Sequence, residues 1–127
     1  MTEEVKKYME KAEKSLKVAK ELFGREYFED ACSKAYYVMF YAAQALLKNI
    51  RVDVSKHSAV VAKFGQHFAK TDKIDPKYHR FLIDAKKKRE TADYDVFSFI
   101  DEETAEQIIS WAEDFLGKIK EELERGQ

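Results

Sequence analysis

The sequence contains few turn-forming residues, one cysteine and no long apolar run. Four Gly and one Pro in 127 residues are too few for the many tight turns of an all-β fold. The single Cys32 excludes an internal disulfide and is typical of a reducing compartment. No apolar run reaches the roughly 18 residues of a membrane span, and the N-terminus lacks the pattern of a signal peptide. We therefore expect a soluble cytoplasmic protein that does not interact with membranes.

An excess of charge of one sign is also absent. The formal net charge of −1 gives no long-range attraction to nucleic acid, so binding of that kind would need a local basic patch. Charged residues nevertheless make up 37% of the chain and hydrophobic residues 45%, a combination typical of amphipathic helices. The length is that of one domain. We expect a single helical domain spanning residues 1–127.

The most apolar stretch is residues 35–47, in which Gln44 is the only amide side chain. A helix that is hydrophobic on nearly every side must be enclosed by other helices. The stretch therefore predicts a central helix, which we expect to begin at Glu29 and to end near Asn49.

Four further segments carry apolar residues at helical spacing. They are residues 3–23, 55–68, 76–92 and 101–123. Gly24 is expected to be a left-handed C-cap of the first segment, and Ser55 and Asp101 are expected N-caps. Asp75 followed by Pro76 predicts another helix start. The sequence thus predicts an all-α fold, an antiparallel bundle of four long helices plus one shorter helix.

Residues 93–100 are predicted to connect the last two helices and to expose Phe97 and Phe99. Exposed aromatic side chains in one short segment indicate a contact with a second copy or with another protein. Packing against the protein's own bundle is the equally supported alternative.

Arg89 is the most informative polar residue. The apolar stripe of the fourth helix continues from Leu82 and Ala85 to Arg89, so its guanidinium is expected to point inward and to need acceptors. Asp93 lies at helical spacing, and further acceptors are the hydroxyls of Tyr36, Tyr37, Tyr41 and Tyr94. Arg89 is then either a structural link between two helices or part of a binding site. Lys86–Lys88 are expected to be largely solvated.

The three histidines, His57, His67 and His79, lack the spacing of metal ligands. No Gly-rich phosphate loop occurs either, so we expect neither a metal nor another cofactor. His57 is expected to help cap the third helix, and His67 and His79 to lie on the surface. Ser33, Tyr36 and Tyr37 offer hydroxyls to a ligand, although aromatic residues at helical spacing are more often part of a core. Cys32 lacks the partners of a nucleophile.

Three segments carry a family resemblance: residues 31–43, 57–64 and 89–95. In this order and spacing they resemble the small, stand-alone HEPN-domain proteins of prokaryotes, from the first helix to about Leu123. The resemblance implies a homodimer that often works with a nucleotidyltransferase partner as a toxin–antitoxin pair.

Active HEPN proteins are metal-independent ribonucleases whose motif is an Arg, four to six other residues, and then a His. Arg89 matches the Arg. The three positions where the His would fall hold Tyr94, Asp95 and Val96, so the chain departs from the ribonuclease motif. Tyrosine, with a pKa near 10, is a poor base at neutral pH.

The leading hypothesis is a non-catalytic dimeric module that binds a nucleotidyltransferase-type protein, or a nucleotide or RNA. One alternative is a ribonuclease in which Tyr94 or His57 acts with Arg89 in place of the missing His. A second alternative is a purely structural helical adaptor. The candidate ligand- or partner-binding residues are Arg89, Asp93, Tyr94, Ser33, Tyr36, Tyr37 and His57.

Overall fold

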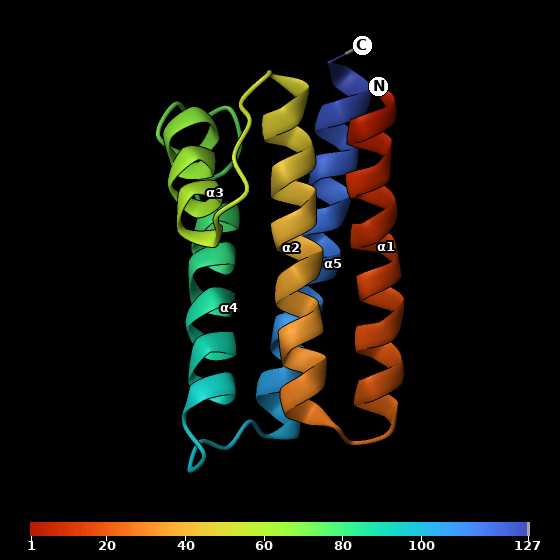
Figure 1. Cartoon of the computed structure of the whole chain (residues 1–127), viewed down its shortest axis with the longest axis vertical. Coiled ribbons are helices and arrows are strands. Elements are labelled where there is room, and N and C mark those ends of the chain that lie inside the picture. The colour runs from red at the N-terminus through yellow and green to blue at the C-terminus, as the bar shows by residue number, and fades with distance from the viewer. Residues whose placement is uncertain (127) are drawn as a thin grey trace.

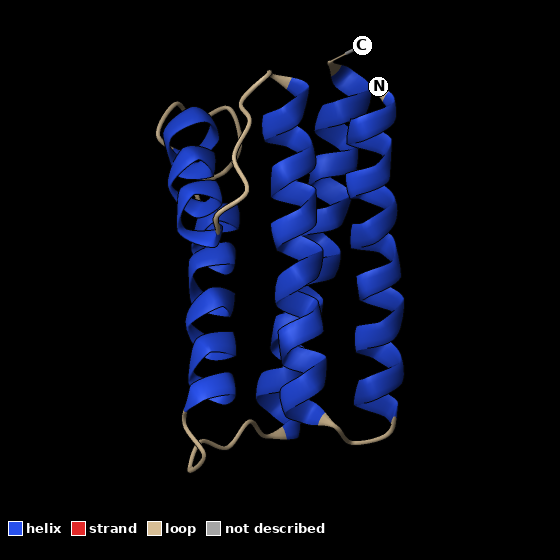
Figure 2. Cartoon of the chain, in the orientation of Figure 1, coloured by secondary structure: helices blue, strands red, loops and turns tan. Residues whose placement is uncertain are grey.

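In the computed structural model, which describes residues 1–126, every regular element is a helix (Figure 2). The elements in chain order are α1 (Glu3–Gly24), α2 (Phe28–Asn49), α3 (His57–Phe64), the single π-helical turn η1 (Gly65–Ala69), α4 (Lys77–Tyr94) and α5 (Glu102–Arg125). This confirms the predicted all-α bundle of four long helices and one shorter helix. Within residues 1–126 no helix combines the length and the apolar character that crossing a membrane requires.

Helix α2 lies at the centre of the bundle. It packs against α1, α5, α4 and α3, and consecutive long helices run antiparallel (Figure 1). Thirteen of its 22 residues are buried, Gln44 among them. The amide of Gln44 donates a hydrogen bond of 3.0 Å to the carbonyl of Val54, so the one amide in the apolar stretch is satisfied by the loop that leads to α3. The sequence predicted this central position correctly.

Helix α4 is joined to α5 by aromatic and polar contacts. The rings of Phe81 and Trp111 stack with centroids 5.0 Å apart and planes 7° apart. Near the start of α4 the buried Tyr78 donates its hydroxyl to Asp114 Oδ1 at 2.8 Å. These contacts fix α4 along the bundle and so fix the direction in which Arg89 projects.

The turn η1 approaches α4 closely at Gly65. A Cβ atom at this position would lie 2.5 Å from Cε1 of His79, whose Nε2 is 3.0 Å from the carbonyl of Val61. The ring of His79 therefore packs against α3 and η1. Both histidines were expected on the surface, and both are half-buried instead.

Two predicted caps differ from the structure. Gly24 is the last residue of α1, and the left-handed backbone (φ 65°) occurs two residues later at Glu26. Ser55 does not cap α3, since the residue before that helix is Lys56 and no side chain caps it. In both places the chain turns one or two residues away from the position that local propensity favours.

The other two predicted helix starts are close to the observed ones. Asp101 Oδ1 accepts a hydrogen bond of 2.8 Å from the Thr104 amide, which confirms it as the N-cap of α5. Asp75 Oδ1 accepts from the Lys77 amide at 2.9 Å, although α4 begins after Pro76 rather than at it.

Candidate functional site

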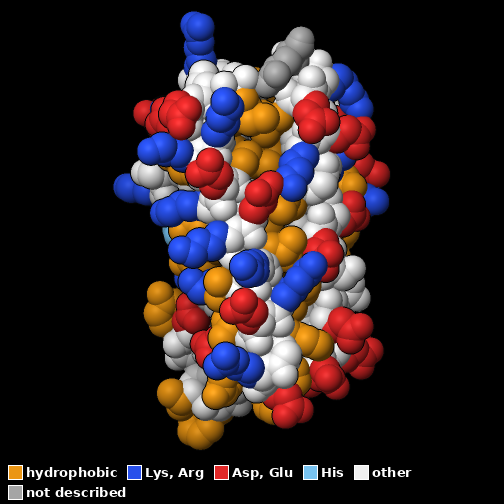
Figure 3. Space-filling view, turned by 90° about the vertical axis from the view of Figure 1, so that its right-hand side faces the viewer, with side chains coloured by type: hydrophobic (Ala, Val, Ile, Leu, Met, Phe, Trp, Pro, Cys, Tyr) orange, Lys and Arg blue, Asp and Glu red, His pale blue; other side chains and the backbone are white. Residues whose placement is uncertain are grey.

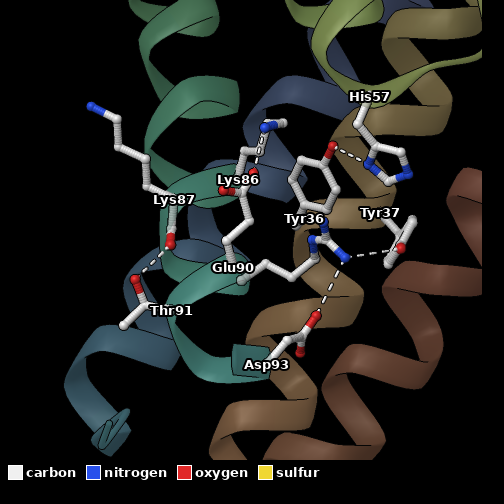
Figure 4. A network of polar contacts seen from close by, with 9 residues as sticks. Tyr36, Tyr37, His57, Lys86, Lys87, Glu90, Thr91 and Asp93 are labelled. Carbon is white, nitrogen blue, oxygen red and sulfur yellow. Dashed lines mark hydrogen bonds and ion pairs between the residues drawn. The ribbon is translucent and has the colours of Figure 1, made fainter. Parts of the chain in front are cut away.

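Arg89 extends from α4 to Tyr37 on α2, in the direction that the apolar stripe predicts. Figure 4 shows the neighbouring residues Tyr36, Tyr37, His57 and Asp93. Its side chain is 13% exposed. Nη1 donates to the hydroxyl of Tyr37 and to Asp93 Oδ2, both at 3.3 Å. The guanidinium carbon lies 5.1 Å from the ring centroid of Tyr36 and 5.5 Å from that of Tyr37, within the range of a cation–π interaction. Arg89 is thus held by charge, hydrogen bonds and aromatic faces together.

The Nε–H group of Arg89 is a buried donor. Nε is buried and has no hydrogen-bond acceptor among the residues that the structure describes. A buried donor without an acceptor is costly and uncommon.

His57, the first residue of α3, lies beside Tyr36 and Tyr37. We call Arg89, Asp93, Tyr36, Tyr37 and His57, with their neighbours Phe40 and Glu90, the Arg89 cluster. Its Nδ1 lies 2.8 Å from the hydroxyl of the fully buried Tyr36, and its ring stacks on Phe40 with centroids 4.2 Å apart and planes 14° apart. The expectation that His57 caps its helix was wrong. Its side chain links α3 to α2, because the turn before α3 brings the first residue of that helix over the aromatic face of α2.

Burial and nearby positive charge keep His57 neutral. Burial is the largest cause that lowers its pKa below the ordinary value of 6.5, and Arg89 and Lys86 lower it further, against Glu90. Burial also raises the pKa of Tyr36 well above its ordinary value. At neutral pH the pair is therefore an imidazole and a phenol, joined by a hydrogen bond whose direction depends on the tautomer of His57.

Two of the four basic residues of the run 86–89 are paired with acids one turn later. Lys86 forms an ion pair with Glu90, as Arg89 does with Asp93. The Lys86 interaction lowers the pKa of Glu90. Lys87 and Lys88 are exposed as expected, whereas Lys86 is half-buried, because the ion pair holds it along the α3–α4 groove. Arg89 and Lys86, the two basic residues of this run nearest to His57, are therefore both engaged in ion pairs.

The cluster leaves out two of the predicted site residues. Tyr94 is 80% exposed at the end of α4, and no hydrogen bond joins it to Arg89 among the described residues. Ser33 is half-buried on α2 and makes no side-chain hydrogen bond within residues 1–126. Of the predicted acceptors, only Asp93 and Tyr37 bind Arg89, because Tyr36 places its ring rather than its hydroxyl beside the guanidinium.

Phe40 and Glu90 belong to the cluster and were missed. Phe40 lies one helical turn after Tyr36, so the helical period could have placed it on the same face. Nothing in the sequence indicated that His57, 21 residues away from Tyr36, stacks on this face.

The structure also describes Cys32 and the arrangement of side chains that could bind a metal. Cys32 is fully buried, and burial raises the pKa of its thiol to about 12, which suits a core residue rather than a nucleophile. Within residues 1–126 no three His, Cys, Asp or Glu side chains lie close enough together to hold a metal ion.

Comparison of the sequence with known proteins places the chain in a family. The HEPN domain matches residues 5–123. Two Methanocaldococcus jannaschii proteins, named "Putative toxin MJ0142" and "Putative toxin MJ0605", are 38% and 37% identical to the chain. The first alignment covers 94% of this chain and 82% of the relative, and the second covers 95% and 90%. A Gloeobacter violaceus protein, "UPF0332 protein glr0978", is 38% identical over 74% of this chain and 75% of its own length. The chain belongs to the HEPN domain family.

Proposed function

We propose that this chain is a non-catalytic, dimeric HEPN module that binds a nucleotidyltransferase-type protein as one half of a toxin–antitoxin pair. The observation that carries the proposal is the engagement of Arg89. Its Nη1 is shared between Asp93 and Tyr37, and the three positions where the ribonuclease motif has its His hold Tyr94, Asp95 and Val96. The Arg is present, but its charge is already compensated by Asp93, and other residues occupy the positions of its catalytic partner.

The charges around Arg89 disfavour a phosphate. A phosphate that approaches the guanidinium has to compete with the Asp93 carboxylate, which is already within hydrogen-bond distance of it. Asp95 adds a further negative charge where the motif has its His. A protein surface, such as that of a second copy, therefore fits this face better than the alternative ligands, a nucleotide or an RNA.

Support for the toxin–antitoxin context comes from the relatives and from the resemblance. Two relatives carry the word toxin in their names, and HEPN proteins of this size often work with a small nucleotidyltransferase. We expect the neighbouring gene to encode such a protein and the two purified proteins to elute together from a sizing column. Separate elution of the two at micromolar concentration would reject this partner.

The dimer is proposed on the face of α2 and α4 that carries Arg89. Tyr37 and Tyr41 are half-buried on this face, and a second copy would cover the parts of their rings that are still exposed. Light scattering at tens of micromolar should give twice the chain mass of 14.9 kDa. A monomer across that concentration range would discard the dimer.

A ribonuclease that uses Arg89 and His57 is the second candidate, because His57 lies in the Arg89 cluster. If Nδ1–H of His57 donates to Tyr36, Nε2 keeps a lone pair that can accept a proton, as a general base requires. This candidate predicts metal-independent RNA cleavage that is lost in both Arg89→Ala and His57→Ala. The matched control is His67→Ala, a histidine on η1 outside the cluster, which should leave cleavage intact.

A further inference from the structure

Five large side chains lie exposed at one end of the bundle. Phe97, Val96, Phe99 and Tyr94 are 92%, 90%, 82% and 80% exposed, and Tyr27 is 55% exposed. We call these five residues the end surface. Apolar side chains scattered singly on a surface are ordinary, but several close together indicate a contact with another molecule.

The segment that carries four of these side chains is an ordered turn. Asp95 Oδ1 accepts a hydrogen bond of 2.9 Å from the Phe97 amide, and the Asp95 carbonyl accepts one of 3.0 Å from the Ser98 amide. Ile100 then anchors the segment in the core at 6% exposure. The aromatic rings are thus held outward by a fixed backbone, so a partner that binds them orders little additional chain.

The α1–α2 connection extends this surface. Tyr27 and Phe99 line one shallow depression together with Phe28, Ile100 and three acidic residues, Glu26, Glu29 and Asp30. The α1–α2 and α4–α5 connections lie at the same end of the molecule (Figure 1), and hydrophobic side chains project at that end in the space-filling view (Figure 3). The end surface is therefore continuous across two segments far apart in the sequence.

The rim of the end surface is acidic. Residues 94–103 contain four carboxylates and no Lys or Arg, with Lys88 of α4 close enough to Asp101 to lower the pKa of its carboxyl, and residues 25–30 contain three carboxylates and one Arg. Much of this charge belongs to the N-terminal turns of α2 and α5, where the helix dipole stabilises Glu29, Asp30, Glu102 and Glu103. By contrast, the face of α1 and α5 in Figure 3 mixes charges of both signs.

We propose that the end surface binds a basic, apolar peptide segment of a partner protein, in which Lys or Arg alternates with large apolar residues. The apolar side chains would contact Phe97 and Phe99, and the cations would face the carboxylates of the rim. A second copy fits less well, because a two-fold contact through this end would bring two acidic rims together. The inference rests on the proposed function, since it specifies the partner's contact chemistry.

The test measures binding of two amidated hexapeptides, Lys-Leu-Lys-Leu-Lys-Leu and Glu-Leu-Glu-Leu-Glu-Leu, to the full chain by backbone amide NMR shifts. The basic peptide should shift the amides of residues 26–30 and 94–100 and should bind more weakly as salt is added. The acidic peptide should not shift them. Equal binding of both peptides, or shifts confined to other parts of the chain, would overturn the proposal.

Two variants distinguish specific binding at the end surface from non-specific binding to any exposed apolar side chain. The double substitution Phe97→Ser with Phe99→Ser should weaken binding of the basic peptide at least about tenfold, the range expected when central aromatic contacts are removed. Ile50→Ser is the matched control, because Ile50 is an exposed apolar residue (42%) at the other end of α2, and it should leave binding unchanged.

Light scattering on the same variants shows whether the end surface binds a second copy of the chain. If the Phe97/Phe99 variant turns a dimer into a monomer, the end surface pairs two copies and the proposal is wrong. RNA cleavage by the parent protein would reject the non-catalytic function. Peptide binding is measured separately, so its result still decides whether the end surface binds a basic, apolar segment.

Discussion

Arg89 is held by more than its ion pair. Asp93, its ionic partner, has a side chain 39% exposed, so the Coulomb attraction alone is screened by water. The cation–π contacts with the Tyr36 and Tyr37 rings and the hydrogen bond to the Tyr37 hydroxyl add to this attraction. Together they make Arg89 a structural link between α4 and α2, whatever else it binds.

We expect Arg89→Ala to lower the free energy of unfolding by about 1–2 kcal/mol, because it removes cation–π contacts and a hydrogen bond from a mostly buried site. Thermal denaturation should show a melting temperature lower by roughly 3–8 °C. Lys87→Ala, on the exposed side of the same helix, is the control and should change the melting temperature little. An unchanged melting temperature for Arg89→Ala would reject the structural link.

His57 makes stability depend on pH in one direction. Burial, Arg89 and Lys86 hold its folded-state pKa below 6.5, so the unfolded chain binds a proton at a higher pH than the folded chain does. The resulting stability is fully present above pH 6.5 and is lost as the pH falls towards the lowered pKa. Melting temperatures between pH 7.5 and 5.5 should therefore fall less steeply for His57→Asn than for the parent. Parallel curves for the two proteins would show that protonation of His57 does not destabilise the folded state.

At the scale of elements, the joint between η1 and α4 depends on a residue without a side chain. Gly65 lies against the ring of His79, and that ring is fixed by the carbonyl of Val61. At Gly117, in the middle of α5, a Cβ would meet no atom within 4 Å apart from the neighbouring backbone of its own helix. The two glycines therefore differ in packing while both lie in helical backbone.

Gly65→Ala should lower the free energy of unfolding by about 1–3 kcal/mol, because the added methyl group overlaps the His79 ring. Gly117→Ala is the matched control and should raise it by about 0.5–1 kcal/mol, since alanine favours helix and meets nothing. Chemical denaturation of both variants measures the two changes. A stabilised Gly65→Ala variant would mean that α3 and η1 are not fixed against α4.

The elements themselves were predictable because each depends on local periodicity. The apolar run around Ala42 predicted the central helix, and the stripe through Leu82 and Ala85 predicted the inward direction of Arg89. Helix ends were less predictable. The left-handed turn falls at Glu26 rather than Gly24, because the chain turns where α2 packs against α1 rather than where glycine favours it.

At the scale of the molecule, the candidate site combines α2, α3 and α4, and only part of it was predictable. Asp93 follows Arg89 by one helical turn, so the sequence indicated their ion pair. The stacking of His57 on Phe40 depends on how the loop after α2 brings α3 back over the bundle, which no local pattern encodes. Tyr94 was grouped with Arg89 by its distance along the chain, yet the end of α4 turns it to solvent.

The non-catalytic function is tested most directly by RNA cleavage in the presence of excess EDTA, with the parent protein and Arg89→Ala measured side by side on several RNAs. We predict no cleavage by the parent beyond that of the variant, because the Arg89 charge is compensated by Asp93. Cleavage by the parent that disappears in Arg89→Ala, with the variant still folded, would contradict the proposal and establish a metal-independent ribonuclease.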